Sequence, residues 1–273
     1  MKVLVVANET LGGRPLLEAV QQRAQSAETE FFLVVPQNKP RHGNVVHTDA
    51  VRDAAQIRVD LAMDVLGDQG IKAAGEVGDP DPFTATMDAV GEIRPDEIIV
   101  STYPVTSSGW LRRDLVERIE HATGLPVQHV VVDLDQEGLP FTVTLVVANR
   151  TVRGEELIAR LKAKAAEGEH LFIVVVPQES RSGADADAAQ ARLGEMLQAM
   201  RGAGLVCAGM IADPDPYTAT MNALQSFRVG EVVISTLPQT KSGWLRGDLI
   251  ERVRRATAAP VEHVVVELER ARA

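Results

Sequence analysis

The chain contains one long segment twice. Nine residues, DPDPFTATM, begin at Asp79, and they return almost unchanged as DPDPYTATM at Asp213. Over residues 78–134 and 212–268, a constant offset of 134 gives about 33 identities in 57 positions. The repeated unit of about 135 residues is well above the 20 to 50 residues of solenoid repeats, so each copy can bury its own core. The sequence therefore predicts two similar tandem domains, 1–138 and 139–273, with a short linker at 135–140 (DQEGLP).

Short runs rich in valine and isoleucine alternate with longer amphipathic stretches in each copy. The runs lie at 2–7, 30–35, 71–77, 97–101 and 127–132, and again at 142–148, 170–176, 205–211, 231–235 and 261–266. Such nearly continuous runs are typical of buried parallel strands. Helices are predicted between them, at 14–27, 49–68, 82–92 and 111–123, and at 153–166, 184–203, 216–227 and 245–257. The alternation predicts an α/β fold with a doubly wound, five-stranded parallel sheet in each domain.

Charge and cysteine content exclude several classes of partner. A formal net charge of −10 and a pI near 5.1 oppose binding to nucleic acid or anionic lipid, because phosphate binding needs a basic face. Cys207 is the only cysteine, so neither an intramolecular disulfide nor a cysteine-cluster metal site can form. No run approaches about 18 apolar residues, and the first apolar run is too short for a signal peptide. We expect a cytoplasmic protein with no membrane or nucleic-acid partner.

In a doubly wound sheet, ligands bind outside the carboxyl ends of the strands where the strand order reverses. If the order is 3-2-1-4-5, the relevant loops begin at Asn8 and Thr102 in the first copy and at Asn149 and Thr236 in the second. The duplicated segment STYPVTSSGWLR falls at this point and returns as STLPQTKSGWLR. It leaves a buried strand with several hydroxyl groups, turns at a proline and enters a helix at Ser-Gly-Trp. This location predicts a binding site in each domain.

The chemistry of this segment suits an anion. A serine N-cap followed by free backbone N–H groups, together with the helix dipole, attracts negative charge, and a nearby arginine adds a bidentate donor. The alternative is a purely structural segment, with serine as a cap, glycine for the turn and tryptophan covering the sheet. The candidate ligand-binding residues are Asn8, Ser101, Thr102, Thr106, Ser108, Gly109, Arg112, Asn149, Ser235, Thr236, Thr240, Ser242, Gly243, Arg246 and Gly247.

The chain resembles the universal stress protein family in its tandem two-domain form. The resemblance rests on the strand and helix order, on Gly-Asp-Pro at 78–80, on the segment after the fourth strand, and on ATGLPV at 122–127 with its copy ATAAPV. It implies Rossmann-like domains, similar to adenine nucleotide alpha hydrolases, with ATP or another adenine nucleotide as the candidate ligand. It also implies an intramolecular pseudo-dimer that pairs the last strands, 127–132 and 261–266, and a homodimer as a further assembly.

The sequence departs from the family's nucleotide-binding pattern, Gly-x2-Gly-x9-Gly-(Ser/Thr). Serines 101 and 235 stand at the first glycine, prolines 104 and 238 at the second, and Arg-Asp or Gly-Asp pairs near the close. Proline has no N–H to donate to a phosphate. Asn8 and Asn149 stand near the position where the family places a base-contacting aspartate, and asparagine keeps an acceptor while adding a donor. The expected site is therefore a modified nucleotide or anion site.

Two further sequence patterns contain residue types that occur in metal-binding or catalytic sites. The repeated Asp-Pro-Asp-Pro is either a carboxylate cluster for a cation or a helix start with an aspartate cap and a proline in the first turn; we favour the helix start. His129 and His263 lie at equivalent strand positions without a second ligand at metal-binding spacing, and we expect them to face an interface. Neither a metal nor a catalytic residue is predicted.

Known enzyme motifs are missing from the sequence. It has no Gly-x-Ser-x-Gly elbow, no phosphate-binding P-loop and no Gly-x-Gly-x-x-Gly after the first strand. We therefore expect a non-enzymatic, stress-linked protein that binds a ligand or regulates. Two alternatives remain open: a tandem scaffold that acts through protein partners without binding nucleotide, and a weak nucleotide hydrolase. Lys241 and Gly247 favour the second copy as the preferred site for any phosphate ligand.

Overall fold

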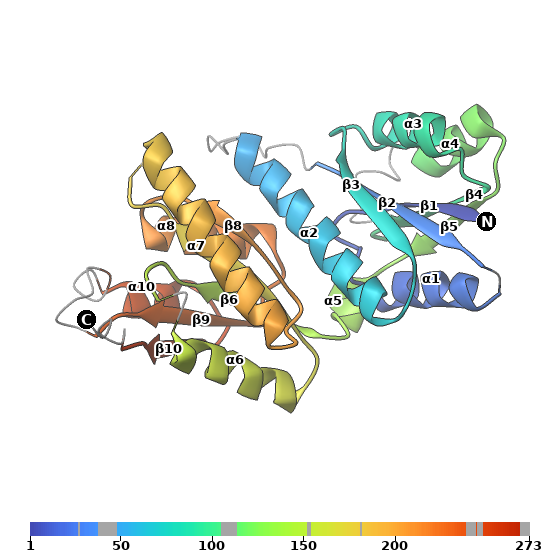
Figure 1. Cartoon of the computed structure of the whole chain (residues 1–273). Helices are drawn as coiled ribbons and strands as arrows, with labels where there is room; N and C mark the ends of the chain where they lie inside the picture. The colour runs from blue at the N-terminus through green and yellow to red at the C-terminus, as the bar shows by residue number, and fades with distance from the viewer. Residues whose placement is uncertain are drawn as a thin grey trace. The chain divides into compact units, whose positions relative to one another are not determined.

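The computed structural model describes residues 1–26, 28–37, 48–104, 114–151, 154–180, 182–238, 244 and 248–267. The chain divides into two compact units, Met1–Pro140 and Phe141–Ala273. Each unit contains one parallel sheet with helices on both faces (Figure 1). The two units, called the first and second domain below, are described one at a time.

The elements follow the alternation that the sequence predicts. The first domain contains β1 (Lys2–Val6), α1 (Arg14–Ser26), β2 (Glu30–Pro36), α2 (Thr48–Asp68), β3 (Ala73–Gly78), α3 (Pro82–Ile93), β4 (Glu97–Thr102), α4 (Leu115–Thr123), β5 (Val127–Val131) and α5 (Leu134–Glu137). The second contains β6 (Thr142–Val147), α6 (Glu155–Glu167), β7 (His170–Pro177), α7 (Gly183–Gly202), β8 (Cys207–Ala212), α8 (Pro216–Ser226), β9 (Glu231–Thr236), α10 (Leu249–Ala256) and β10 (Val261–Val265).

Both sheets have the predicted topology. The first has the order β3-β2-β1-β4-β5, and the second, written from the opposite edge, has the order β10-β9-β6-β7-β8. All strand pairs are parallel, for example β1 with β2 and with β4. The order reverses between β1 and β4 and between β6 and β9, so the α/β fold class and the 3-2-1-4-5 order are confirmed. These two reversals are the switch points of the domains.

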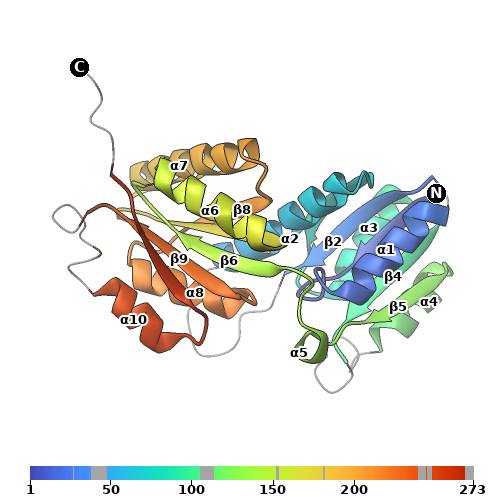
Figure 2. The same cartoon turned by 90° about the horizontal axis from the view of Figure 1, so that it is seen from below.

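The helices cover both faces of each sheet. In the first domain, Leu16 and Val20 of α1 and Val59 of α2 pack on one face, whereas Ala89 of α3 and Ile119 of α4 pack on the other. Figure 2 shows the same layering in the second domain, where α6 and α7 lie on one side of the sheet and α8 and α10 on the other. The three inner strands of each sheet, β2, β1 and β4 in the first domain and β9, β6 and β7 in the second, are almost wholly buried, which explains their continuous valine and isoleucine runs.

The repeated Asp-Pro-Asp-Pro segment begins a helix in each domain. The Asp81 carboxylate caps α3 by accepting from the Thr84 backbone N–H at 3.1 Å, and Asp215 caps α8 in the same way at 2.9 Å. A proline follows each cap at the first turn, where the missing N–H costs nothing. The capping interpretation that we favoured is therefore the one that the geometry supports.

Two helices begin four residues later than predicted. The last helices were predicted from 111 and 245, but α4 begins at Leu115 and α10 at Leu249. Before each of them, Asp114 and Asp248 adopt a left-handed backbone with φ of 49°, and this conformation interrupts a right-handed helix. The predicted linker also contains a helical turn, α5, because the Asp133 side chain accepts from the backbone N–H groups of residues 135 and 136.

None of the helices in the described part of the chain combines the length and the apolar character needed to cross a membrane. The longest, α2 and α7, each carry several charged residues.

Candidate functional site

The predicted site residues at the ends of the first and fourth strands of each domain meet at the switch points. Ala7 and Asn8 follow β1, and Ser101 and Thr102 end β4, which is hydrogen-bonded to β1. In the second domain the ends of β6 and β9 meet in the same way. Because both strands of each pair point in one direction, their carboxyl ends bring these polar groups to one edge of the sheet.

An asparagine follows the first strand in both domains. Asn8 is buried, with 6% of its surface exposed, and its Nδ2 donates to the Pro36 carbonyl at 2.7 Å. This bond ties the end of β1 to the end of β2. In the second domain, Asn149 Oδ1 is buried and has no hydrogen-bond partner among the described residues. The amide oxygen of Asn149 is therefore available to a ligand that carries a donor.

A buried serine ends the fourth strand in both domains. Ser101 and Ser235 are each 1% exposed, and the hydroxyl of neither has a partner within the described ranges. Leaving a buried hydroxyl without a hydrogen bond costs about 1–3 kcal/mol, and native proteins keep few such groups. The same unsatisfied hydroxyl occurs at the same place in two copies, which marks the switch points as the candidate sites.

The next residue, threonine, binds a histidine of the last strand. Thr102 Oγ1 lies 2.9 Å from His129 Nε2 and donates to the Tyr103 carbonyl; Thr236 Oγ1 lies 2.8 Å from His263 Nε2. Since the threonine proton goes to the carbonyl, the imidazole Nε2–H donates to the hydroxyl. Desolvation by burial lowers the pKa of both histidines, with the charge of Arg254 adding to the effect at His263. The neutral imidazoles thus hold the last two strands together.

The sequence analysis missed a second buried threonine at each switch point. Thr10 donates to the Ser101 carbonyl at 3.4 Å, and Thr151 donates to the Ser235 carbonyl at 3.3 Å. Both threonines are nearly inaccessible to solvent. The signal for them was an Asn-x-Thr triplet after the first strand of each copy, at an offset of 141 rather than 134.

A glycine behind each triplet permits close packing. A Cβ atom at Gly13 would lie 2.2 Å from Val132 Cγ1, and one at Gly154 would lie 2.3 Å from Val266 Cγ1. Any larger residue would push the start of α1 or α6 away from the sheet. These glycines therefore hold the loop after the first strand close to the fifth strand, beside the serine and threonine of the site.

The remaining predicted site residues lie outside the described ranges. They are Thr106, Ser108, Gly109 and Arg112 in the first copy and Thr240, Ser242, Gly243, Arg246 and Gly247 in the second. The anion site on this loop and the serine caps therefore stay predictions. At the end of the loop, the left-handed Asp114 and Asp248 make no side-chain cap bond, and this conformation costs about 1–2 kcal/mol per residue.

Charged residues around the switch points differ between the domains. In the first, the Tyr103 hydroxyl donates to Glu9 Oε2 at 3.4 Å, and Arg58 of α2 lies in the field of both. Burial lowers the pKa of Arg58, partly offset by Glu9 and Tyr103. In the second, arginine replaces glutamate after the asparagine, and Arg150 forms a two-bond ion pair with Glu179.

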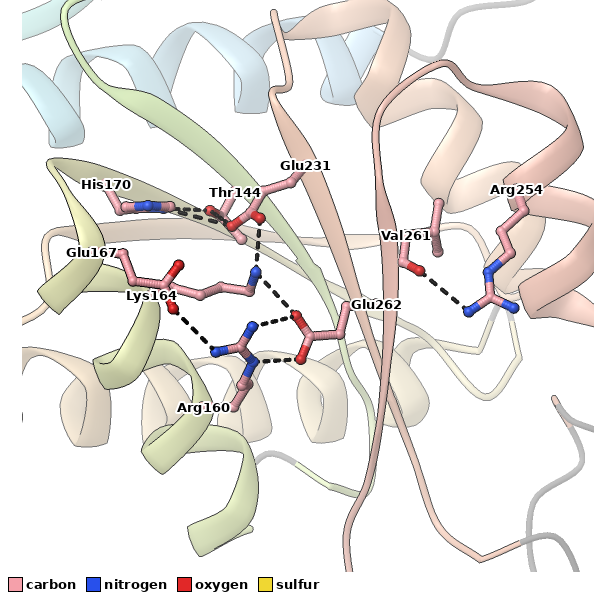
Figure 3. Close-up of polar contacts among 9 residues, drawn as sticks. All are labelled: Thr144, Arg160, Lys164, Glu167, His170, Glu231, Arg254, Val261 and Glu262. Carbon is pink, nitrogen blue, oxygen red and sulfur yellow. Dashed lines mark hydrogen bonds and ion pairs between the residues drawn. The ribbon is translucent and has the colours of Figure 1, made fainter.

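Opposite the switch point, the second domain contains an ion-pair cluster at the amino ends of its strands (Figure 3). Lys164 of α6, 7% exposed at its side chain, lies 2.7 Å from Glu231 Oε2 and 3.0 Å from Glu262 Oε2. Arg160 makes a two-bond pair with Glu262, and the Thr144 hydroxyl donates to Glu231 at 2.7 Å. Every charge is paired, so this cluster joins α6 to β9 and β10.

No group of three or more histidine, cysteine, aspartate or glutamate residues with metal-binding geometry occurs in the described part of the chain. Cys207 is buried in β8, where its Sγ donates to the Leu197 carbonyl at 3.7 Å. The switch points thus contain neutral hydrogen-bonding groups together with a few charged side chains.

Comparison with known proteins gives structural matches alone, since neither a family model nor a curated protein matches the chain. A universal stress protein from Archaeoglobus fulgidus DSM 4304 is 16% identical with a TM-score of 0.37, covering 98% of this chain and 97% of that one. This structure and the two described next carry the name universal stress protein. That name is the name of the family that the sequence resembles.

Two other matches are similarly distant. A putative universal stress protein from Pseudomonas aeruginosa UCBPP-PA14 is 16% identical with a TM-score of 0.33 and covers 97% of this chain and 93% of its own. A universal stress protein family protein from Arabidopsis thaliana, solved with AMP bound, is 14% identical with a TM-score of 0.34 and covers 50% of this chain and 94% of its own. The fold of the present chain rests on its own strand order.

Proposed function

We propose that this protein is a non-enzymatic, stress-linked binding protein that takes a small polar ligand at each switch point. The observation that carries the proposal is the buried, unsatisfied serine hydroxyl at position 101 and again at position 235. A ligand group that exchanges a hydrogen bond with this hydroxyl removes a cost of about 1–3 kcal/mol. The amide oxygen of Asn149 supplies an acceptor for the same ligand in the second domain.

An adenine nucleotide is the first ligand to test. The family resemblance of the sequence implies this class, and an adenine base with its ribose offers both the donors and the acceptors that asparagine and serine require. The groups brought to the switch points are mostly neutral amides and hydroxyls, which support recognition better than they support proton transfer at neutral pH. This chemistry favours binding over catalysis.

The decisive experiment begins with protein purified without added nucleotide. Small molecules released on denaturation are identified by mass spectrometry, and calorimetric titrations with AMP, ADP and ATP follow. We expect saturable binding. A protein that releases nothing and binds none of these nucleotides contradicts the proposal and favours the scaffold alternative.

Serine variants separate a ligand contact from a structural defect. Ser101→Ala and Ser235→Ala remove an unsatisfied group, so the free protein becomes more stable by roughly 1 kcal/mol, while nucleotide affinity falls severalfold. Thr86→Val is the matched control, because the Thr86 hydroxyl donates to the Pro82 carbonyl inside α3 at 2.6 Å, away from the site. Alanine variants that gain stability and bind nucleotide as tightly as the parent would show that the ligand does not use the serines.

A further inference from the structure

Arg192 of α7 has an unused pair of hydrogen-bond donors close to Glu179, which follows β7 in the second domain. Its Nε and Nη2 atoms are buried and have no partner among the residues that the structure describes. Its one ion pair there runs from Nη1 to Glu179 Oε1 at 3.7 Å, on a different donor atom. The Arg192 side chain is 20% exposed, so two N–H groups of a largely buried cation are unsatisfied.

These two atoms form the edge of a guanidinium that binds oxyanions best. Nε–H and Nη2–H point in parallel and match the two oxygens of a carboxylate or phosphate. Arg150 uses this edge on Glu179, at 3.2 Å from Nε and 3.0 Å from Nη2. Arg160 uses the same edge on Glu262. Arg192 has the edge but lacks the oxyanion.

The carboxylates around Arg192 are already engaged. Both Glu179 oxygens are bound by Arg150, and this hydrogen bonding raises the pKa of Arg150. Asp185, two turns earlier on α7, accepts from the hydroxyls of Ser180 and Ser182 at the start of the helix. Those two hydrogen bonds are the main cause of its lowered pKa, and the charge of Arg192 adds a smaller contribution. Neither carboxylate bonds to the Nε–Nη2 edge.

The equivalent arginine of the first domain has a different environment. Arg58 stands at the same position of α2, and Glu9 lies close enough for its charge to act on it. In the second domain Arg150 replaces that glutamate, and Glu179 then pairs with Arg150. The first domain therefore has one arginine, Arg58, near one carboxylate, Glu9. The second domain has two arginines, Arg150 and Arg192, and both contact the single carboxylate of Glu179.

The switch-point groups lie next to this arginine pair. Arg150 directly follows Asn149, whose buried Oδ1 is unpartnered within the described ranges, and Thr151 donates to the Ser235 carbonyl. Arg192 is linked to Asn149 through two residues, since Arg150 bonds Glu179 and Glu179 pairs with Arg192.

We propose that the second domain binds a ligand through a carboxylate or phosphate group held on the Nε–Nη2 edge of Arg192. This inference rests on the proposed function, since it specifies the charged group of the ligand at the second switch point. The ligand pairs its oxyanion with Arg192 and its polar body with Asn149 and Ser235. The first domain, with Glu9 near Arg58, takes the same anion less tightly.

The test measures anion binding to the full chain by calorimetry with AMP, adenosine, inorganic phosphate and succinate. AMP and adenosine differ by one phosphate, and phosphate and succinate distinguish a phosphoryl from a carboxylate preference. We expect AMP to bind at least tenfold more tightly than adenosine. Arg192→Lys keeps the charge but loses the parallel edge, and it should abolish this preference.

Two further variants should change the affinity for AMP in opposite directions. Glu179→Gln removes the competing carboxylate, so AMP affinity should rise severalfold. Arg150→Gln frees Glu179 to occupy Arg192, so AMP affinity should fall at least tenfold. Arg58→Lys in the first domain is the matched control and should change affinity at the tighter site less than twofold. An arginine Nε–H resonance that shifts on adding phosphate to the unmodified protein reports contact without any variant.

The outcomes separate this inference from the proposed function. If the parent binds AMP and Arg192→Lys binds it equally well, the inference is wrong while the proposed function stands. If the parent binds none of the four probes at millimolar concentration and no arginine Nε–H resonance shifts, both are wrong. If adenosine binds as tightly as AMP, the site is neutral and Arg192 has no ligand role.

Discussion

The two domains share the hydrogen bonds at the carboxyl ends of their strands but differ in the charges at the amino ends. At the carboxyl ends, both copies keep the buried serine, the threonine–histidine bond and the second threonine. At the amino ends, the described part of the first domain has two separate ion pairs, Arg23 with Glu97 at 2.8 Å and the exposed pair of Lys72 with Glu28 at 3.5 Å. The second has Lys164 between Glu231 and Glu262, with Arg160 beside them (Figure 3).

The difference shows which contacts a duplicated fold retains. Each neutral bond at the carboxyl ends joins two strands or a strand and a loop in one geometry, so a change on either side leaves a buried group unsatisfied. The Arg23 side chain is 35% exposed, and such a partly exposed pair tolerates exchange better, because solvent screens the partner that remains. The second domain has Lys164 where the first has Arg23, and Glu262 where the first has Gln128. These two differences give the second domain a larger ion-pair cluster on the same strand order.

The largest predicted effect follows from removing the buried lysine. Burial lowers the pKa of Lys164, but the bonds and charges of Glu231 and Glu262 outweigh it and raise the pKa overall. Lys164→Met leaves two partly buried carboxylates near each other, and the second domain should lose about 3 kcal/mol. Arg23→Met, which breaks a more exposed pair, should cost the first domain about 1 kcal/mol.

Urea unfolding measures these losses, and hydrogen exchange detected by mass spectrometry assigns each of them to a domain. Equal losses of stability for Lys164→Met and Arg23→Met would contradict this prediction. They would show that the cluster around Lys164 stabilises its domain no more than the Arg23–Glu97 pair does.

The next effect should be equal in both domains. Gly13→Ala and Gly154→Ala place a Cβ atom 2.2 and 2.3 Å from a valine methyl group, and the required shift of the backbone should cost about 2 kcal/mol in each domain. Thermal and urea unfolding measure the change. Gly168→Ala serves as the control, because a Cβ there meets nothing within 4 Å. A neutral Gly13→Ala would show that the first domain packs less tightly than the second.

A smaller difference is predicted in the response to pH. Burial lowers the pKa of His129 and His263 below the ordinary 6.5, so the unfolded chain binds more protons and both domains lose stability as the pH falls through 6.5. Glu76 acts in the opposite direction. Burial, followed by the charges of Glu92 and Asp88, raises its pKa above the ordinary 4.5, so its contribution improves as the pH falls toward the raised value.

The second domain has methionine at the position of Glu76, so it should lose more stability than the first between pH 7 and pH 5. Hydrogen exchange at both pH values measures each domain in the same sample. His263→Asn should reduce the loss in the second domain. A larger loss in the first domain would contradict the assignment.

The smallest predicted effect is a gain. Glu76→Gln removes a charge that Glu92 and Asp88 repel, so the first domain should become more stable at pH 7 by less than about 1 kcal/mol. Below pH 4.5 the gain should vanish, because the raised pKa of Glu76 means that it carries its proton there in the folded state. A gain that persists at low pH, measured by urea unfolding, would point to a cause other than charge repulsion.

The sequence by itself determined the elements and their order. The five β-branched runs of each copy became the five strands, and the aspartate–proline caps began α3 and α8 where they were expected. These signals are local, because the apolar side chains of a strand themselves indicate that it is buried, and a cap acts within one helical turn. The location of Asn8, Ser101, Asn149 and Ser235 at the switch points was predicted on the condition that the strand order is 3-2-1-4-5, which both sheets have.

Only the tertiary structure decided which polar groups meet. Thr10 reaches a carbonyl 91 residues away, His129 bonds a threonine on the neighbouring strand, and Arg192 keeps an empty donor edge because Arg150 takes both oxygens of Glu179. The left-handed backbone of Asp114 and Asp248, after which α4 and α10 begin, could not be predicted from the helix propensities of the residues either. Such features depend on distances across the sheet and on competition between side chains, and a linear pattern carries neither.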